Sequence, residues 1–244
     1  FAADCDRVVK EFALDGIDID WEYPTSSMAN ISSSPDDTEN FTLLMQDIRA
    51  AIGNEKELTL ATVASARYID FKAILPSVDF VNIMAYDMAS APKHHSALYP
   101  SGHSGDITSD GAVTAHLKAG VPPSKLVMGM PFYGRGGDGY PSFQDYNKVG
   151  NTDTQYTEKW DEVAQVPYLA DKNDTLVFGF ENPRSLAIKC QYILDKDLLA
   201  SDTDAQSVFH RMKFPWKQGV SFLIHDILAH TYTVISIAIC RLII

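Results

Sequence analysis

The stretch that decides the fold reads DGIDIDWEYP and spans residues 15–24. Because a strand points alternate side chains to opposite faces, its acidic residues Asp18, Asp20 and Glu22 share one face. Two isoleucines and Trp21 share the other face, where we expect a layer of helices to cover them. The sequence therefore predicts a strand that aims three carboxylates together at the interior or the mouth of a sheet.

Three adjacent carboxylates repel one another and are costly to remove from water, so at least one of them binds a proton more tightly than usual. A carboxyl group of that kind can act as a general acid near neutral pH. Two other interpretations stay open. The acids could line a solvated strand face, although parallel strands in βα proteins are covered on both faces. They could also form a calcium loop, but the Ile and Trp spacers do not match an EF-hand.

Outward from this stretch, helix-like and strand-like segments alternate over residues 1–130, which favours parallel βα units. Residues from Tyr133 to about Asn173 are expected to be rich in loops, with a further strand near Val177. The remaining predicted strands are Leu58–Ala64, Phe80–Ala85 and Lys125–Pro131. The predicted helices lie at the N-terminus, around residues 34–52, at Phe71–Leu75, at Gly111–Ala119 and at Pro183–Leu194.

Composition narrows the class of protein. The chain has 244 residues, of which 45% are apolar and 21% charged, which is typical of a soluble globular protein with one sizeable core. Its 32 acidic residues exceed its 20 basic ones, so the net charge of −12 repels nucleic acid and suits a neutral or cationic substrate. Residues 231–240 are uncharged, but Arg241 interrupts them well short of the roughly 20 apolar residues of a spanning helix, and we expect no membrane anchor.

Candidate metal ligands are few. Three widely spaced cysteines form neither a disulfide framework nor a paired metal site. His94, His95 and His103 share one predicted loop, but adjacent histidines point apart and the chain contains no HExxH motif. The sequence therefore predicts no metal site.

The acidic stretch resembles the DxxDxDxE signature of the family 18 glycoside hydrolases, the chitinases and their relatives. Asp15, Asp18, Asp20 and Glu22 stand at its four fixed positions. The Tyr23-Pro24 pair that follows is more similar to a chitinase than to an endo-N-acetylglucosaminidase.

Two later segments extend this resemblance in the family's order. MAYD at residues 84–87 is similar to the MxYD end of a barrel strand, and MPFYGR at residues 130–135 is similar to the next strand. The resemblance covers about residues 1–200 and implies an α/β fold, a (β/α)8 barrel with its site at the carboxyl ends of the strands. Because the chain opens in what resembles the helix before the fourth strand, we expect a truncated barrel of about strands four to eight.

The last strand of that barrel is atypical. Where the family has a strand that ends in tryptophan, this chain reads SDTD at residues 201–204. We therefore expect residues 1–200 to form a partial catalytic barrel of the family-18 type. Residues 201–244 are an atypical C-terminal segment, which we leave unassigned.

The resemblance also implies roles for single residues. Glu22 would be the general acid and then the base, and Asp20 would orient and stabilise the acetamido group of the sugar. Asp18 would share a proton or hydrogen bond with Asp20, and Tyr86 would donate its phenol proton to the acetamido oxygen. The implied substrate-binding residues are Met84, Asp87, Tyr133 and Arg135.

The implied reaction is hydrolysis of β-1,4-N-acetylglucosaminyl linkages in chitin or chitooligosaccharides. The substrate's own 2-acetamido group attacks the sugar, configuration is retained, and neither a metal nor an organic cofactor is needed. Two alternatives are a non-catalytic sugar-binding barrel, which the presence of Glu22 disfavours, and an endo-β-N-acetylglucosaminidase that acts on N-glycans, which Trp21 and Tyr23-Pro24 disfavour. A third is that this chain, without strands one to three, is inactive by itself.

Partners and location follow from the same resemblance. We expect chitin or N-acetylglucosamine oligosaccharides as the binding partners, with no nucleic acid and no membrane. The full-length protein is expected to be a monomer. Secretion or periplasmic export is expected because a polymeric substrate of this kind lies outside the cell.

Overall fold

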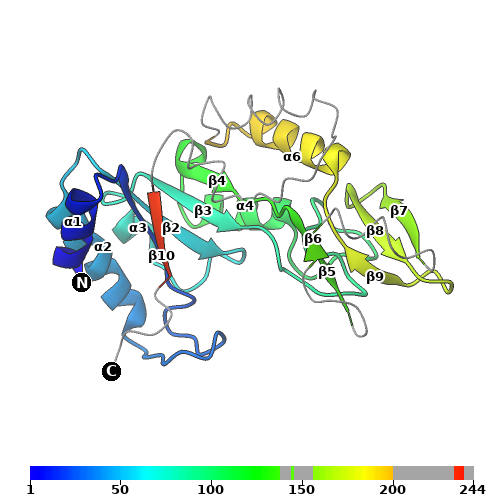
Figure 1. The fold of residues 1–244 in the computed structure, drawn as a ribbon, viewed down its shortest axis with the longest axis horizontal. Coiled ribbons are helices and arrows are strands. Elements are labelled where there is room, and N and C mark those ends of the chain that lie inside the picture. The colour runs from blue at the N-terminus through cyan, green and yellow to red at the C-terminus, as the bar shows by residue number, and fades with distance from the viewer. Residues whose placement is uncertain (138–143, 146–155, 200–233, 239–244) are drawn as a thin grey trace.

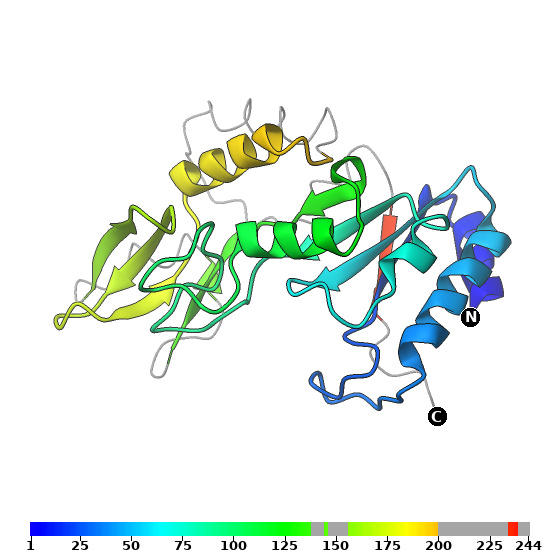
Figure 2. The same cartoon turned by 180° about the vertical axis from the view of Figure 1, so that it is seen from behind.

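The computed structural model describes residues 1–137, 144–145, 156–199 and 234–238. Seen from both sides, the chain has two parts (Figure 1, Figure 2). The first part holds the N-terminus and combines helices with a parallel sheet, and the second is an antiparallel sheet at the far end of the molecule.

The parallel sheet has the strand order β10-β1-β2-β3-β4, and each neighbouring pair runs parallel. Within the described ranges it is an open sheet, with β4 and β10 as its edges. Its strands are β1 (Gly16–Asp20), β2 (Glu57–Val63), β3 (Phe80–Met84), β4 (Leu126–Met128) and β10 (Val234–Ala238). The helices are α1 (Ala2–Glu11), α2 (Asp37–Ile52), α3 (Phe71–Ile74), α4 (Ser109–Lys118), the short 3-10 helix η1 (Pro123–Lys125) and α6 (Pro183–Asp195).

The predicted alternation of strands and helices is confirmed, with ends that differ by a few residues. The two faces of β1 are also as the sequence predicts, because Ile17 and Ile19 are fully buried while the acids of the opposite face are half-buried. Trp21 packs edge-on against Phe41 of α2, with ring centroids 5.9 Å apart. Helices therefore cover the apolar face of β1 and leave its acidic face for other contacts.

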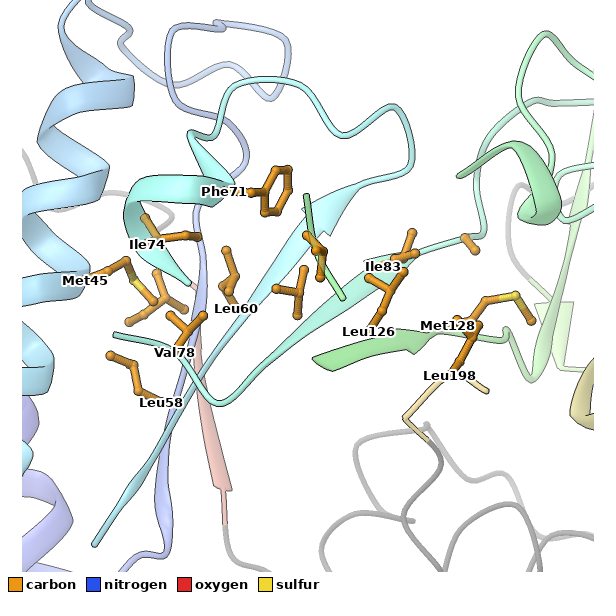
Figure 3. Packing of buried hydrophobic residues seen from close by; sticks show 14 of the residues in the cluster. Met45, Leu58, Leu60, Phe71, Ile74, Val78, Ile83, Leu126, Met128 and Leu198 are labelled. Atoms are coloured by element: carbon orange, nitrogen blue, oxygen red, sulfur yellow. The ribbon is translucent and has the colours of Figure 1, made fainter. Parts of the chain in front are cut away.

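Buried side chains between the sheet and its helices form the main core. Met45 of α2 and Ile74 of α3 approach Leu58 and Leu60 of β2 (Figure 3). Farther along the sheet, Ile83, Leu126, Met128 and Leu198 continue the same cluster. This core fixes the strands whose ends carry the predicted site.

The C-terminal segment is described over one strand only. β10 pairs in parallel with β1, and Val234 stands opposite Gly16 while Ala238 stands opposite Asp20. Residues 201–233 and 239–244 of the segment that the sequence leaves unassigned lie outside the described residues. In the part of the chain that is described, none of the helices is long and apolar enough to cross a membrane.

The second sheet corrects one prediction. The sequence predicts loops from Tyr133 to Asn173, but most of the described residues there form strands of an antiparallel sheet with the order β6-β5-β9-β8-β7. β8 is buried along its whole length, so it lacks the alternation of apolar and polar residues by which a half-buried strand is recognised. The strands are β5 (Tyr133–Gly136), β6 (Gln144–Asp145), β7 (Thr157–Asp161), β8 (Val166–Ala170) and β9 (Leu176–Gly179).

Replacement of Leu60 by alanine tests the main core. The side chain is 0% exposed in β2, so Leu60→Ala should lower the free energy of unfolding by about 2–5 kcal/mol through lost burial and the cavity left behind. Leu43→Ala is the matched control, because Leu43 is 51% exposed on α2 and should cost less than about 0.5 kcal/mol. Urea denaturation measures both changes, and equal losses would contradict the packing described here.

Candidate active site

The acidic face of β1 meets the ends of two neighbouring strands. β1, β2 and β3 are consecutive in one parallel sheet, so their carboxyl ends lie at the same edge. Glu22 follows the end of β1, while Tyr86 and Asp87 follow the end of β3. The phenol of Tyr86 interacts electrostatically with Asp20 and Glu22, which places these groups close together.

Asp18 is the acid that is tied most firmly to the sheet. Its Oδ1 accepts a hydrogen bond of 2.5 Å from Thr59 Oγ1 of β2 and one of 3.1 Å from Asn82 Nδ2 of β3. Sequence reasoning missed Thr59, although the parallel register places it opposite Asp18. The proton or hydrogen bond that we expect between Asp18 and Asp20 stays a prediction.

Asp20 carries a carboxyl group whose pKa is strongly shifted. Its Oδ1 is buried and has no hydrogen-bond partner among the described residues. Burial, together with the negative charges of Glu22 and Asp18, raises the pKa of Asp20 to about 6. This carboxyl can therefore hold a proton, or accept a hydrogen bond from a bound molecule, close to neutral pH.

Tyr86 retains its proton in this environment. Burial and the charges of Asp20 and Asp87 raise the pKa of Tyr86 to about 12, so the phenol is a hydrogen-bond donor at neutral pH. The ring needs a glycine at the end of β4. A Cβ atom at Gly129 would lie 2.7 Å from the carbonyl oxygen of Ile83 and 3.0 Å from Tyr86 Cε1.

Tyr23 interacts with Glu22, and Tyr68 stacks on Tyr23; the sequence does not predict either as a site residue. The rings of Tyr23 and Tyr68 stack with centroids 5.7 Å apart and an angle of 23° between their planes. Burial, the charge of Glu22 and a hydrogen bond to Glu22 raise the pKa of Tyr23. Tyr68 follows β2, and Thr38 of α2 donates a hydrogen bond of 2.9 Å to its carbonyl oxygen. The sequence marks Tyr23 as part of the signature segment, but its only signal for Tyr68 is a place after a parallel strand.

Asp87 is the centre of a second group of side chains. Its backbone has φ 55°, in the left-handed region that few residues other than glycine adopt. Arg135 Nη1 lies 3.2 Å from Asp87 Oδ1, and His95 Nδ1 lies 3.4 Å from the same oxygen, a contact too long for a well-formed hydrogen bond. Burial pushes the pKa of Asp87 upward, but contacts with His95, Arg135 and Tyr133 outweigh it and leave the pKa lowered.

The structure therefore brings together seven of the eight predicted site residues. Tyr133 links the two groups, since its ring meets that of Tyr86 edge-on at 6.3 Å and its phenol interacts with Asp87. The eighth, Met84, is half-buried at the end of β3 and shares a strand face with Asn82, and its role as a sugar contact stays a prediction. Within the described ranges, no group of three His, Cys, Asp or Glu side chains could hold a metal ion.

Comparison with known proteins identifies the family. The chain matches the model for glycosyl hydrolases family 18 over residues 1–200, and it therefore belongs to that family. The parallel βα units and the family together confirm the predicted fold class, a (β/α)8 barrel of which the described residues form an open part.

Individual relatives point in the same direction. The chain is 32% identical over 250 aligned residues to Chitinase A1 of Niallia circulans, with coverage of 81% of this chain and 35% of that protein. It is 31% identical to an endochitinase of Manduca sexta, with coverage of 80% and 43%. A family 18 N-acetylglucosaminidase from Paenibacillus barengoltzii superimposes with a TM-score of 0.76 at 28% identity, with coverage of 87% and 74%. The chain thus spans less than half the length of the first two relatives.

The raised pKa of Asp20 makes stability depend on pH. Folding raises this pKa from 3.8 to about 6, so the stabilising contribution of this group is complete below pH 3.8 and is lost as the pH rises toward 6. Asp20→Asn removes this titration. As the pH rises from 3.8 to about 6, the free energy of unfolding of the wild type should therefore fall relative to that of the variant. Urea denaturation at several pH values measures this difference. A difference that stays constant with pH would contradict the raised pKa.

Proposed function

We propose that this chain hydrolyses β-1,4 linkages between N-acetylglucosamine units in chitin or chitooligosaccharides. The observation that carries the proposal is the meeting of Glu22, Asp20 and Tyr86 at one edge of the sheet in a chain of family 18. The likeness to Chitinase A1 and to the insect endochitinase supports chitin as the substrate.

In the first step Glu22 donates its proton to the glycosidic oxygen, and the bond between that oxygen and the anomeric carbon breaks. The electron pair leaves with the oxygen, while the carbonyl oxygen of the 2-acetamido group bonds to the anomeric carbon and forms an oxazolinium ion. Tyr86 donates a hydrogen bond to the acetamido oxygen and holds it in place. Asp20 accepts a hydrogen bond from the acetamido N–H through Oδ1, which has no partner among the described residues, and stabilises the positive charge.

In the second step the carboxylate of Glu22 takes a proton from water, and the oxygen of that water attacks the anomeric carbon. The bond to the acetamido oxygen breaks, so two inversions give retention of configuration. Asp18 holds the inner end of the acidic face through Thr59 and Asn82. The sugar is bound by Asp87, Tyr133, Arg135 and Met84.

Glu22→Gln tests the acid directly. The amide keeps the shape of the side chain but has no proton to donate, so cleavage of chitotetraose should fall by at least about 10²–10⁴-fold. Products are measured by mass spectrometry, with Glu11→Gln on the exposed face of α1 as the matched control. The wild type and both variants are also tested with barrel strands one to three of Chitinase A1 fused ahead of the chain. The proposal fails if Glu22→Gln cleaves as fast as the control, or if no protein cleaves in either form.

Tyr86→Phe tests the positioning of the acetamido group. The ring still fills the space beside Gly129, but the donor is lost, so kcat should fall by roughly 10²-fold with little change in the free energy of unfolding. Tyr99→Phe, at a partly exposed tyrosine, serves as the control and should keep the wild-type rate. An unchanged kcat in Tyr86→Phe would remove Tyr86 from the mechanism.

A second candidate, which the sequence leaves open, is an endo-β-N-acetylglucosaminidase that acts on N-glycans. Cleavage of a high-mannose glycopeptide in preference to chitotetraose would favour it. Binding of chitotetraose with no cleavage would instead favour a sugar-binding protein without catalysis. For either enzyme we propose secretion or periplasmic export, because the substrate lies outside the cell.

A further inference from the structure

Two adjacent buried histidines face different parts of the molecule. His94 and His95 lie in the loop between β3 and α4 and are 2% and 1% exposed. The ring of His94 contacts Asp161 at the end of β7, in the antiparallel sheet. The ring of His95 contacts Asp87, which follows β3 of the parallel sheet. A single dipeptide thus touches both sheets.

The contact of His94 is a hydrogen bond to a carboxylate that organises the β7–β8 turn. His94 Nε2 lies 3.1 Å from Asp161 Oδ2. Burial lowers the pKa of His94 to about 4, so the ring is neutral at pH 7 and donates its N–H. The same oxygen accepts a hydrogen bond of 2.7 Å from Ser101, while Asp161 Oδ1 accepts from the backbone of Val163 and Ala164. The position of His94 is therefore fixed by the hairpin.

His95 is confined on several sides. Its Nδ1 lies 3.4 Å from Asp87 Oδ1, and its ring packs against that of Tyr133 with centroids 5.6 Å apart. The backbone of β9 passes directly behind it, since a Cβ atom at Gly179 would lie 3.5 Å from His95 Cδ2. The carbonyl oxygen of His95 also accepts a hydrogen bond of 3.0 Å from the amide of Met88, the residue after Asp87.

We propose that His95 is a positioning residue for Asp87, and that the hydrogen bond between His94 and Asp161 sets the place of His95. The antiparallel sheet thereby determines how Asp87 presents its carboxylate to a sugar. This inference rests on the proposed function, in which Asp87 binds the substrate.

The strained backbone of Asp87 supports this assignment. A non-glycine residue at φ 55° persists only when its surroundings hold it there. The side chain of Arg135, which also contacts the carboxylate, is 25% exposed, whereas His95 is fully buried and its carbonyl oxygen accepts a hydrogen bond from Met88, the residue after Asp87. Loss of the His95 ring leaves the charge of Arg135 in place but removes the fixed neighbour.

A double-mutant cycle tests this. His95→Leu should lower kcat/KM for chitotetraose about tenfold, mainly through KM, and in an Asp87→Asn background the same change should have less than about a twofold effect. His95→Asn should recover most of the loss, because its amide nitrogen can take the place of Nδ1. His94→Leu should show the same dependence on Asp87, and His94→Gln should recover it through an amide near the position of Nε2.

His116→Asn is the matched control. His116 is also fully buried but bonds to Thr62 and the backbone of Ala112, away from Asp87. Any loss that it causes should be the same in the wild-type and Asp87→Asn backgrounds. The inference is overturned if His95→Leu lowers kcat/KM by the same factor in the wild-type and Asp87→Asn backgrounds.

An activity-independent measurement separates this inference from the proposed function. Imidazole ¹⁵N resonances are recorded for the whole chain, and Asp87→Asn should shift those of His95. Asp161→Asn should shift the resonances of both histidines, whereas Asp36→Asn in an exposed loop should shift neither. Unchanged His95 resonances in Asp161→Asn would overturn the inference even in an active enzyme. A chain that shows the expected shifts but cleaves no chitotetraose would contradict the proposed function alone.

Discussion

The desolvation of three neighbouring carboxylates along one strand is the constraint on which the rest of this structure depends. A sheet can tolerate such a row only if its neighbours supply donors, and β2 and β3 do so through Thr59 and Asn82, which both bond to Asp18. A slip of one residue in register would turn the acids into the apolar core and leave those donors unpaired. The same contacts that neutralise the cost of burial therefore also fix the alignment of the three strands.

Asp20 does not receive the hydrogen bonds that offset the burial of Asp18. One of its oxygens is buried without a partner among the described residues, and its pKa is raised to about 6 for that reason and by its charged neighbours. Asp87 shows the opposite solution, because cationic and hydrogen-bonding neighbours lower its pKa in spite of burial. Asp20 and Asp87 thus differ in proton affinity although both are aspartates of the same site. Such a difference suits one group that exchanges hydrogen bonds during a reaction and another that remains charged.

The sequence was sufficient for features that depend on alternation along a single strand or on a motif of fixed spacing. The face shared by Asp18, Asp20 and Glu22 is of this kind, as is the arrival of Tyr86 and Asp87 at the same edge. It was insufficient where the structure depends on which strands become neighbours. Thr59 and the Tyr23–Tyr68 stack depend on register between strands, and β8 was missed because burial on both faces removes its periodicity. The partner of His94, Asp161, comes from a strand that the sequence did not predict.

The division of β1 into two faces has a consequence for protein engineering. Odd positions along residues 17–21 contact the helices, and even positions from 18 to 22 carry the chemistry. A library restricted to apolar exchanges at Ile17 and Ile19 would vary the melting temperature and leave the acidic face unchanged. A library at Asp20 and Glu22 would vary proton affinity and leave in place the hydrogen bonds of Asp18 that align the strands. Stability and reactivity can thus be selected separately within the six consecutive residues 17–22, of which the last two follow β1.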